Sequence, residues 1–343
     1  MVRAALLGLA LLLAACKSEP ARLELAGQTM GTTYSIVALD LEAKLDPDRV
    51  QAAVEATLER VNAGMSNWDP ASEISRFNAQ DSTDPVGISG ELAEVMAAAD
   101  RVHRLSEGQF DVTLGPLIEL WGFGSRTPDT PQPDDRAIAA AMALVGQDRM
   151  LVLDAGGSPA TLAKTQPGVD VYLAAIAKGY GVDAVAVTLR DLGLSDYLVE
   201  IGGEVVAAGR NPEGAPWRIG IERPDTAGRS VQQVVGLSDM GMATSGDYRN
   251  YFERDGVRYS HIIDARTGRP VSHATASVTV LAESAMMADA WATALLALGR
   301  ERGMRIAEAQ DLAVLFIARD AQAGDNGFVT TTSARFRDLQ AGR

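Results

Sequence analysis

A carboxylate and a hydroxyl stand four residues apart in the segment ADAWATALLALG, at Asp289 and Thr293. Residues four apart lie on one face of a helix, so the two side chains would meet there. Both are oxygen donors, which Mg²⁺ accepts while it completes its coordination with water and substrate phosphates. In the alternative interpretation, the Thr293 hydroxyl bonds to the carbonyl four residues earlier and Asp289 faces solvent. The pair therefore marks a candidate magnesium site.

A lysine is embedded among small and apolar residues in the segment AAIAKGYGVD. Lys178 would act as a point charge for a phosphate group, and Gly179 and Gly181 would let the backbone approach a ligand closely. The glycines match neither the GxGxxG pattern nor a P-loop. A helix start with a surface lysine is therefore an equal alternative.

Two further segments combine polar side chains with turns. In GMATSGDYRNYF, Thr244, Ser245 and Gly246 would either contact a phosphate or ribose or form a capped turn into a helix. In SHIIDARTGRP, His261 is a candidate base near neutral pH, three residues before Asp264. Alone, the four segments indicate a phosphate and magnesium site in a globular protein.

The elements that would position these segments are helices and strands in mixed order. Apolar residues at helical spacing, between a capping residue and a glycine, predict helices over 46–64 and 89–108, with Asp46 and Ser89 as caps. Further helices are expected at 176–194 and 284–298, and strands at 24–39, 196–210, 217–224, 232–246, 257–264, 276–282 and 312–319, the last closing the body. His103 falls inside the second helix beside two arginines and is expected to be partly exposed. Because strands and helices do not alternate strictly, the pattern predicts an α+β or mixed α/β fold.

The first twenty residues, MVRAALLGLALLLAACKSEP, have the pattern of an export signal. Their apolar run from Ala4 to Ala15 is shorter than the roughly 20 residues that span a bilayer. Cys16 follows directly and resembles the acylated cysteine of a bacterial lipobox. Its lipid chains would hold the protein on the periplasmic side of a membrane, and Lys17 favours the outer over the inner membrane. The expected division is a signal peptide at 1–15, a lipidated tether at 16–27 and one domain at 28–343.

The composition agrees with an exported body that has no disulfide. Cys16 is the only cysteine, so the core alone must hold the fold, and 343 residues with 47% hydrophobic content suffice for that. The 45 acidic residues exceed the 31 basic residues, which gives a formal net charge of −14. This charge argues against nucleic acid as a partner, because phosphate binding needs a basic face. The lipid anchor is the only membrane contact expected.

The four segments occur together with other motifs, and the combination resembles the bacterial FAD:protein FMN transferase family, the ApbE flavin transferases. The matching motifs run from about Thr29 to the last strand and are GQTMGTTYSI, MSNWDPASEISRFN, GQFDVTLGPLIELWGFG, AAIAKGYGVDAV, LVEIGGEV, ATSGDYRNYF, SHIIDARTGRPV and ADAWATALLALG. The resemblance implies an α+β (mixed α/β) fold with a T-fold-like core of mixed sheets and packed helices. It also implies an enzyme that uses Mg²⁺ to transfer FMN from FAD onto a threonine hydroxyl of an acceptor protein, releasing AMP. The acceptors would be similar to subunits of Na⁺-pumping quinone reductases and related electron-transfer complexes.

The resemblance further assigns roles to single residues. Contacts to the flavin cofactor are implied for Met30, Trp68, Gln109, Phe110, Asp111, Lys178 and Ile263. Magnesium would bind the side chains of Asp289 and Thr293 and the backbone carbonyl of Ala175. Position 292 adds an acid in some relatives, and Ala292 cannot supply a side-chain oxygen there.

Tyr172 departs from the family pattern. The family commonly has an aspartate at this cofactor-contacting position, three residues before the metal-binding carbonyl. Tyrosine is bulkier and neutral, so either cofactor contact is altered or Asp170, expected on the same face of a strand, compensates.

His261 is the candidate general base for the transfer, because it lies in a matched motif and histidines are scarce. In this hypothesis it removes the threonine proton, while Mg²⁺ neutralises the pyrophosphate charge and orients the phosphorus for in-line attack. Two alternatives stay open. One is hydrolysis of FAD to FMN and AMP at the same site, and the other is a non-catalytic flavin-binding lipoprotein.

Overall fold

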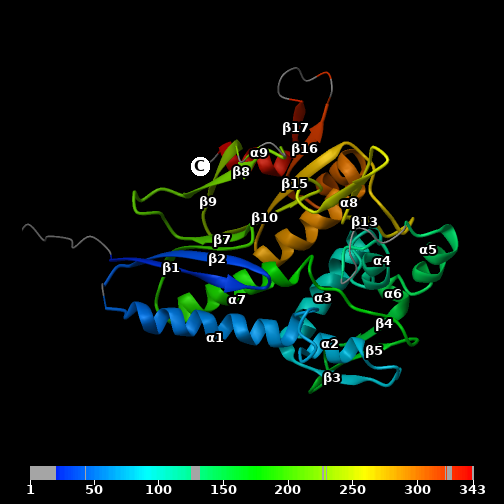
Figure 1. The fold of residues 1–343 in the computed structure, drawn as a ribbon. Coiled ribbons are helices and arrows are strands. Elements are labelled where there is room, and N and C mark those ends of the chain that lie inside the picture. Colours follow the sequence, from blue (N-terminus) through cyan, green and yellow to red (C-terminus); the bar gives the residue numbers. More distant parts are fainter. Residues whose placement is uncertain are drawn as a thin grey trace, which may run out of the picture.

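An eight-stranded sheet organises the protein. The computed structural model describes residues 21–42, 44–124, 132–225, 228, 230–320, 322 and 327–341, so the expected signal peptide and Cys16 lie outside the described residues. The strands, in spatial order, are β1 (Ala21–Thr29), β2 (Thr32–Asp40), β6 (Asp196–Ile201), β7 (Glu204–Ala208), β10 (Met240–Gly246), β15 (Thr275–Ala282), β16 (Ala313–Arg319) and β17 (Phe328–Thr332). Figure 1 shows this sheet running from the blue β1 to the red β17.

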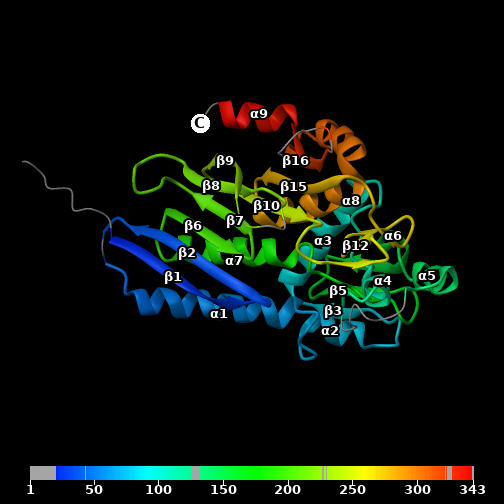
Figure 2. The ribbon, with the colours of Figure 1, turned by 45° about the horizontal axis from the view of Figure 1, so that its top comes forward.

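The two faces of the sheet are covered differently. One face packs against three helices, α1 (Pro47–Met65), α7 (Ala177–Asp191) and α8 (Ala285–Ala309). The other face packs against the ribbon of β8 (Trp217–Glu222) and β9 (Val231–Leu237) and against α9 (Ala334–Ala341). Figure 2 shows the β8–β9 ribbon and α9 on the side of the sheet opposite α7.

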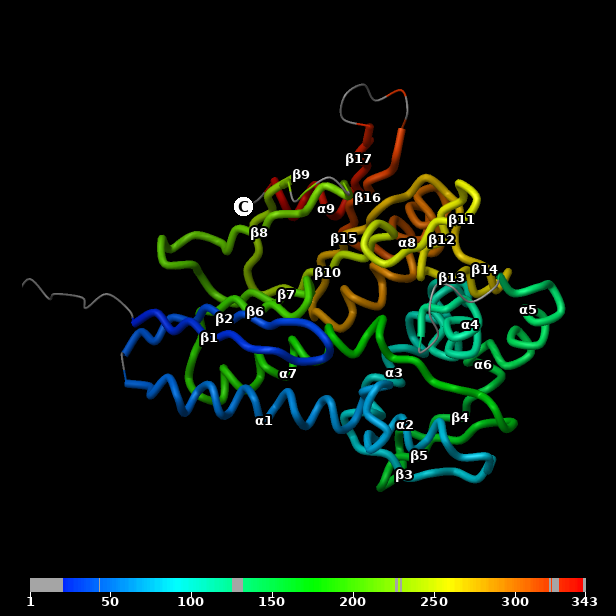
Figure 3. Tube along the Cα trace, viewed as in Figure 1, coloured from blue at the N-terminus to red at the C-terminus, as the bar shows by residue number. Residues whose placement is uncertain are grey.

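A second group of elements lies beyond the C-terminal end of α1 and packs beside α8, where the tube in Figure 3 changes from blue to cyan and green. It contains the three-stranded sheet β3–β5–β4 and several helices. Their bounds are α2 (Glu73–Asn78), β3 (Val86–Ile88), α3 (Gly90–Leu105), α4 (Gly115–Leu120), α5 (Asp135–Met142), α6 (Gln147–Met150), β4 (Leu151–Asp154) and β5 (Ala160–Lys164). Two small hairpins complete the fold: β11 (Tyr251–Arg254) with β12 (Val257–Ser260), and β13 (Ile263–Asp264) with β14 (Arg269–Pro270).

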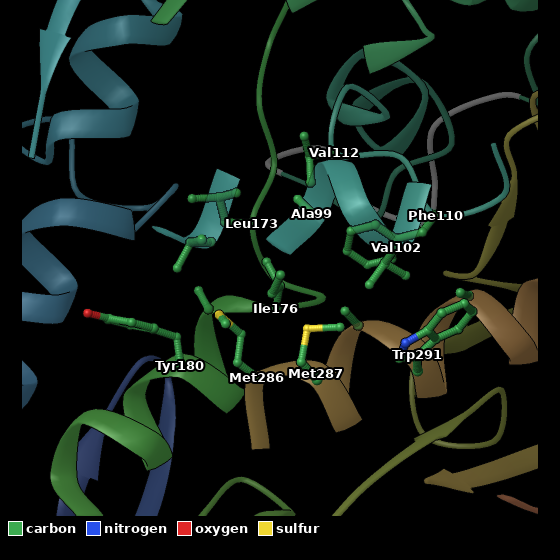
Figure 4. Packing of buried hydrophobic residues seen from close by; sticks show 14 of the residues in the cluster. Ala99, Val102, Phe110, Val112, Leu173, Ile176, Tyr180, Met286, Met287 and Trp291 are labelled. Atoms are coloured by element: carbon green, nitrogen blue, oxygen red, sulfur yellow. The ribbon is translucent and has the colours of Figure 1, made fainter. Parts of the chain in front are cut away.

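The largest hydrophobic cluster joins this second group to α7 and α8. Figure 4 shows Ile176, at the start of α7, with Met286 and Met287 of α8 in this cluster, facing Leu173 and Val112. Ile176 and Leu173 are fully buried, and Met286 and Met287 are 8% and 9% exposed. Close packing here gives the crossing of α7 and α8 a fixed geometry.

The N-terminal strand corrects two expectations. The segment expected as one strand over 24–39 is a hairpin, in which β1 pairs with β2 from Ala21↔Asp40 to Thr29↔Thr32. Its turn contains Met30 at φ 49° and Gly31 at φ 70°, and a left-handed methionine is an uncommon turn signal. The tether expected to reach residue 27 is also too long, because β1 begins at Ala21 and buries Leu23 and Leu25.

The C-terminal part contains elements that the pattern did not predict. β16 does not close the body, because β17 pairs with it and α9 follows. Helix α8 continues to Ala309 but is interrupted at Gly299, at φ 75° and ψ 166°. The α+β class is confirmed, although every strand pairing of the described residues is antiparallel and the sheets are not mixed. None of the described helices is both long enough and apolar enough to cross a bilayer.

Candidate active site

A cavity of about 360 Å³ collects most of the residues that the sequence singled out. The predicted residues that line it are Gln109, Phe110, Asp111, Tyr172, Ala175, Lys178, His261, Ile263, Asp289 and Thr293. Met30 and Trp68 line a smaller pocket of about 100 Å³, which shares Ala174 and Lys178 with the cavity. Ala292 lines neither space, because it is fully buried in the core. A larger cavity of about 640 Å³ beside α7 contains none of the predicted site residues.

The start of α7 brings Lys178 to the cavity. This helix has no side-chain cap of its own at Ile176. Helix α8 provides the acceptor instead, because the Gly179 N–H donates to Asp289 Oδ2 at 3.1 Å. Gly179 is the third residue of α7, a position whose N–H an N-cap side chain normally accepts. Asp289 and Lys178 therefore meet at a helix N-terminus, where partial positive charge favours anions.

Three charged groups converge beside this helix end. Lys178 Nζ forms an ion pair with Glu204 Oε1 of β7. Burial opposes protonation of Lys178, but the carboxylates of Asp289 and Glu204 outweigh it and raise the lysine pKa. Burial raises the pKa of Glu204 to about 7 against the effect of Lys178, and burial likewise raises the pKa of Asp289. Two acids therefore lie close to one ammonium, and Glu204 Oε2 has no hydrogen-bond partner among the described residues.

Two hydroxyls from separate segments meet on the wall of the cavity. Thr293 Oγ1 of α8 lies 2.9 Å from Ser245 Oγ of β10. Asp289, one helical turn away, is only 3% exposed, so the interpretation that it faces solvent is wrong. Lys178 is half-buried rather than a surface lysine, and Ser245 ends a strand rather than capping a helix. The structure therefore brings together the segments that the sequence could only name separately.

The segment that carries Tyr172 and Ala175 is held by two asparagines. Asn67 Nδ2 and Asn78 Nδ2 both donate to the Val171 carbonyl, at 2.7 and 2.8 Å. Asn78 Oδ1 accepts the Val171 N–H at 2.8 Å, and Asn67 Oδ1 accepts the Leu173 N–H at 2.8 Å. The amide side chains replace a neighbouring strand, so an irregular segment keeps satisfied backbone groups.

Asp170 does not compensate for Tyr172 in the way expected. Residues 168–176 form no strand, so the alternation that would place both side chains on one face does not apply. Tyr172 lines the cavity, whereas Asp170 does not and lies against Gly115 instead. Burial raises the pKa of Asp170, and the charge of Lys164 opposes this rise. The cavity thus has a phenol, not a carboxylate, at this position.

The segment 109–111 provides one available acceptor and one occupied carboxylate. Gln109 is 2% exposed and donates through Nε2 to Asp264 Oδ1 at 3.2 Å. Its Oε1 has no hydrogen-bond partner in the part of the chain that the structure describes. Asp111 accepts from the Thr113 N–H at 2.7 Å and the Gln147 N–H at 3.0 Å. Gln109 can therefore accept a hydrogen bond from a ligand, while the Asp111 carboxylate mainly holds its own loop.

His103 of α3 holds this segment through the Phe110 carbonyl. The expectation of partial exposure is wrong, because His103 is 6% exposed. Its Nδ1 lies 2.7 Å from the Phe110 carbonyl, which reaches it because the chain turns back at Gly108, at φ 78°. The role of this histidine is thus to hold Phe110 in place.

His261 stands between β12 and β13 at the cavity wall. Its Nδ1 lies 3.0 Å from the Asn250 carbonyl. Because a carbonyl only accepts, this contact assigns the proton to Nδ1 and leaves Nε2 as the basic nitrogen. Burial lowers the pKa of His261, although the Asn250 carbonyl opposes this shift. The ring also meets Phe123 edge-on, with centroids 6.3 Å apart.

Asp264 takes part in a turn and not in a pair with His261. Its Oδ1 accepts from the Arg266 N–H at 2.9 Å, and its carbonyl accepts from the Gly268 N–H at 2.9 Å. Trp121 Nε1 donates to the Gly268 carbonyl at 2.7 Å and so fixes the turn against α4. The turn positions Ile263, which is 3% exposed and lines the cavity.

Comparison with known proteins shows the family to which the chain belongs. Residues 30–316 match the ApbE family model. The chain belongs to the ApbE family. The FAD:protein FMN transferases of Haemophilus influenzae and Vibrio cholerae are 46% and 44% identical to it over 334 and 327 residues, covering 96% and 95% of this chain and 95% of each relative. The solved structure of the flavin transferase ApbE from Vibrio cholerae matches with a TM-score of 0.84 at 43% identity, covering 93% of this chain and 99% of that chain.

Sequence reasoning missed several residues that shape this ApbE site. Glu204 lies in the motif LVEIGGEV, where a charged residue between a glycine pair and an apolar strand was the available signal. Asn67 and Asn78 lie in MSNWDPASEISRFN, but their partners are about one hundred residues away. Arg249 and Asn250 also line the cavity and follow the predicted Thr244–Gly246 stretch.

Proposed function

We propose that this ApbE family member is an FAD:protein FMN transferase that moves the FMN moiety of FAD onto an acceptor protein. The observation that carries the proposal is the convergence of Lys178, Asp289, Thr293 and His261 on one cavity. These residues come from three separate motifs of a chain that is 46% identical to an enzyme of that name over nearly its whole length. A flavin-storage protein would not require a histidine base beside a lysine and a paired carboxylate.

The reaction proposed is an in-line displacement at the flavin-side phosphorus of FAD. A threonine oxygen of the acceptor attacks this phosphorus, and a new P–O bond forms. The bond from the same phosphorus to the bridging oxygen breaks, and AMP leaves with that oxygen. The threonine proton passes to His261 Nε2, because Nδ1 is engaged by the Asn250 carbonyl.

The donor set suits Mg²⁺. Asp289 provides a carboxylate, Thr293 a hydroxyl and Ala175 a backbone carbonyl, all on the same cavity. Among the described residues no cluster of three or more His, Cys, Asp or Glu side chains stands ready to hold a metal, and Mg²⁺ does not need one, because it keeps several waters. The excess of carboxylate over ammonium beside α7, together with the unpartnered Glu204 Oε2, also favours a further cation. When bound, Mg²⁺ would neutralise charge on the pyrophosphate and hold its oxygens for the displacement.

The chain's own residues would orient the substrate around that ion. The N-terminus of α7 and Lys178 present positive charge to the pyrophosphate. Gln109 Oε1 is available to a donor on the flavin, and Ile263 and Phe110 provide buried apolar surface. Trp68, which is 64% exposed, and Met30 would extend this surface in the adjoining pocket.

The acceptor and location proposed follow from the resemblance and the N-terminal sequence. Acceptors would be threonine-bearing subunits of Na⁺-pumping quinone reductases or related electron-transfer complexes. Acylation of Cys16 would keep the enzyme on the periplasmic side of a membrane, with the outer membrane favoured by Lys17. Purification from membranes followed by mass analysis of the N-terminal peptide tests this, and an unmodified Cys16 would contradict it.

One incubation tests the activity. The protein is mixed with FAD, Mg²⁺ and a threonine-bearing acceptor, and intact mass of the acceptor and release of AMP are followed. The expected result is addition of one FMN per acceptor with equal AMP. AMP release that does not depend on the acceptor would favour hydrolysis, and FAD binding without AMP would favour the non-catalytic alternative.

Two variants test the roles of Asp289 and His261 in this assay. Asp289→Asn removes the carboxylate charge at nearly constant size and should abolish transfer. His261→Asn retains an N–H near the position of Nδ1 but has no group at the position of Nε2, so it should retain FAD binding and lose transfer. Transfer at the unchanged rate by His261→Asn would show that another group removes the proton.

A further inference from the structure

Helices α7 and α8 touch through their backbones at the edge of the cavity. A Cβ added at Gly179 would lie 2.3 Å from the Ala285 carbonyl oxygen. On the other side, a Cβ added at Gly241 of β10 would lie 2.3 Å from the Ala285 nitrogen. The first turn of α8 is therefore enclosed between two glycines, and at Gly179 its backbone meets the backbone of α7 directly.

Each of the two helices caps the other across this contact. Asp183 of α7 accepts the Ala285 and Met286 N–H groups of α8, both at 2.8 Å. Asp289 of α8 accepts the Gly179 N–H of α7 at 3.1 Å. Both acceptors are carboxylates at helix N-termini, where charge and hydrogen bonding reinforce each other. The Asp183 and Asp289 contacts thus form one reciprocal clasp, defined here by these three hydrogen bonds.

The clasp determines where the Asp289 carboxylate lies. Asp289 Oδ2 accepts the Gly179 N–H, so Oδ1 is the oxygen that this bond leaves available to a ligand of the cavity that Asp289 lines. Ala285 lies one helical turn before Asp289, so a shift of the first turn of α8 moves the carboxylate with it. Helix α8 has its own local cap, because Ser284 Oγ accepts the Met287 N–H at 3.2 Å. The two bonds from Asp183 are therefore additional to ordinary capping, and they tie α8 to the helix that carries Lys178.

We infer that Asp183 is a positioning residue, which holds the Asp289 carboxylate at the magnesium and pyrophosphate site by fixing α8 against α7. The inference rests on the proposed function, because it assigns a role relative to the same site. Asp183 itself lines the separate 640 Å³ cavity and not the 360 Å³ cavity, so it acts through Asp289 without touching the substrate.

The test compares Asp183→Asn with Ser284→Ala. An asparagine has one acceptor oxygen, so one of the two α8 N–H groups loses its partner and faces an amide NH₂. Ser284→Ala removes a cap from the same turn of the same helix but leaves the clasp intact. Both variants should lower Tm by a similar amount, about 1–3 °C. Mg²⁺ binding is measured by calorimetry in the presence of FMN, together with the Mg²⁺ concentration that gives half-maximal transfer.

The expected result is a separation of the two variants. Asp183→Asn should weaken Mg²⁺ binding about 10-fold, the lower end of the range that follows loss of a direct partner of a metal ligand, because Asp183 acts on Asp289 through α8; the Mg²⁺ requirement for transfer should rise equally. Ser284→Ala should keep the unchanged affinity. Equal Mg²⁺ affinity in Asp183→Asn and the unchanged protein would overturn the inference. Absence of both Mg²⁺ binding and transfer in the unchanged protein would instead overturn the proposed function, and the inference with it.

A measurement on the unchanged protein covers the case in which Asp183→Asn does not fold. Hydrogen exchange is followed with and without Mg²⁺ and FMN. If the clasp couples the two helices, ligands should slow exchange at Gly179 and at Ala285 and Met286 together. Slowing at Gly179 alone would overturn the inference.

Discussion

Replacement of Gly179 by alanine tests the physical basis of the site, because it adds one methyl group at the closest approach of α7 and α8. The new Cβ would lie 2.3 Å from the Ala285 oxygen and 2.7 Å from the Ala285 carbonyl carbon and from Met286 Cα. All three are main-chain atoms, so no side-chain rotation can relieve the overlap. The helices must separate by about 1 Å to restore van der Waals contact.

The size of the effect follows from this displacement. Overpacking a close-packed contact typically costs about 1–3 kcal/mol, which for a domain of this size lowers Tm by roughly 1–5 °C. A separation of about 1 Å also breaks the bond from the Gly179 N–H to Asp289 Oδ2, which is already 3.1 Å long. Because a 1 Å misplacement of a reacting group can reduce a rate about 10²-fold, we expect FMN transfer to fall by a similar factor.

Thermal unfolding and initial rates of FMN transfer together check the prediction. Gly64→Ala is the matched control, because Gly64 lies in the last turn of α1 and, apart from its chain neighbours and the backbone of α1, no atom of the described residues lies within 4 Å of its added Cβ. That control should gain about 0.5–1 kcal/mol from helix propensity and keep full activity. If Gly179→Ala melts at the same temperature and transfers FMN at the same rate as the unchanged protein, the backbone contact does not position the site.

Three further predictions concern other parts of the site. Because burial lowers the pKa of His261 from its ordinary value, its imidazole should stay neutral to a more acidic pH than a free imidazole does. In initial rates measured from pH 5 to 8, the fall on the acid side should therefore come at a lower pH than for a free imidazole, and a fall at higher pH would contradict the assignment of His261 as the base. Burial raises the pKa of Asp183 from 3.8 to about 6, so the folded state binds this proton more tightly than the unfolded state does, and the resulting stabilisation is lost as pH rises from about 4 to about 6. In urea unfolding, the unchanged protein should therefore lose on the order of 2–3 kcal/mol more than Asp183→Asn between pH 4 and pH 7. Equal losses in the two proteins would contradict the raised pKa of Asp183. Asn78→Ala leaves the Val171 N–H without its acceptor, which should lower the free energy of unfolding by about 1–3 kcal/mol. It should also weaken FAD binding, measured by flavin fluorescence. An unchanged affinity for FAD would show that the segment of Tyr172 does not depend on Asn78.

The helices were predictable because their signals are local. Asp46 accepts the Asp48 N–H at 3.1 Å and Ser89 accepts the Leu92 N–H at 3.2 Å, as the capping patterns indicated. The β1–β2 hairpin was missed, since its turn uses a left-handed Met30 instead of the usual Asn-Gly pair. His103 was misplaced because its burial depends on a carbonyl that reaches it only after the chain reverses at Gly108.

The site was predictable as a set of segments but not as an arrangement. Motif spacing pairs Asp289 with Thr293, because both lie on one helix. The contacts that give these residues their geometry join positions far apart in the sequence, such as Asp289 with Gly179 and Asp183 with Ala285. No pattern within a helix or strand specifies such a contact. The sequence marks such a contact only by a glycine at which a side chain would collide with another backbone. Gly179 was interpreted as a residue that lets a ligand approach the backbone, whereas its close neighbour is helix α8.

Charge explains why the cavity needs more than its own residues to bind a pyrophosphate. The charged groups that line it are Asp111, Lys178, Glu204, Arg249 and Asp289, three acids against two bases. Arg249 is already paired with Glu222, so Lys178 is the base that remains to balance Glu204 and Asp289. A substrate that adds negative charge must therefore bring a cation or leave an acid protonated. The pKa of about 7 for Glu204 means that this carboxyl is already partly protonated near neutral pH. A divalent cation on Asp289 and Thr293 would favour the ionised acids and the anionic substrate at once, so metal and FAD should each strengthen the binding of the other.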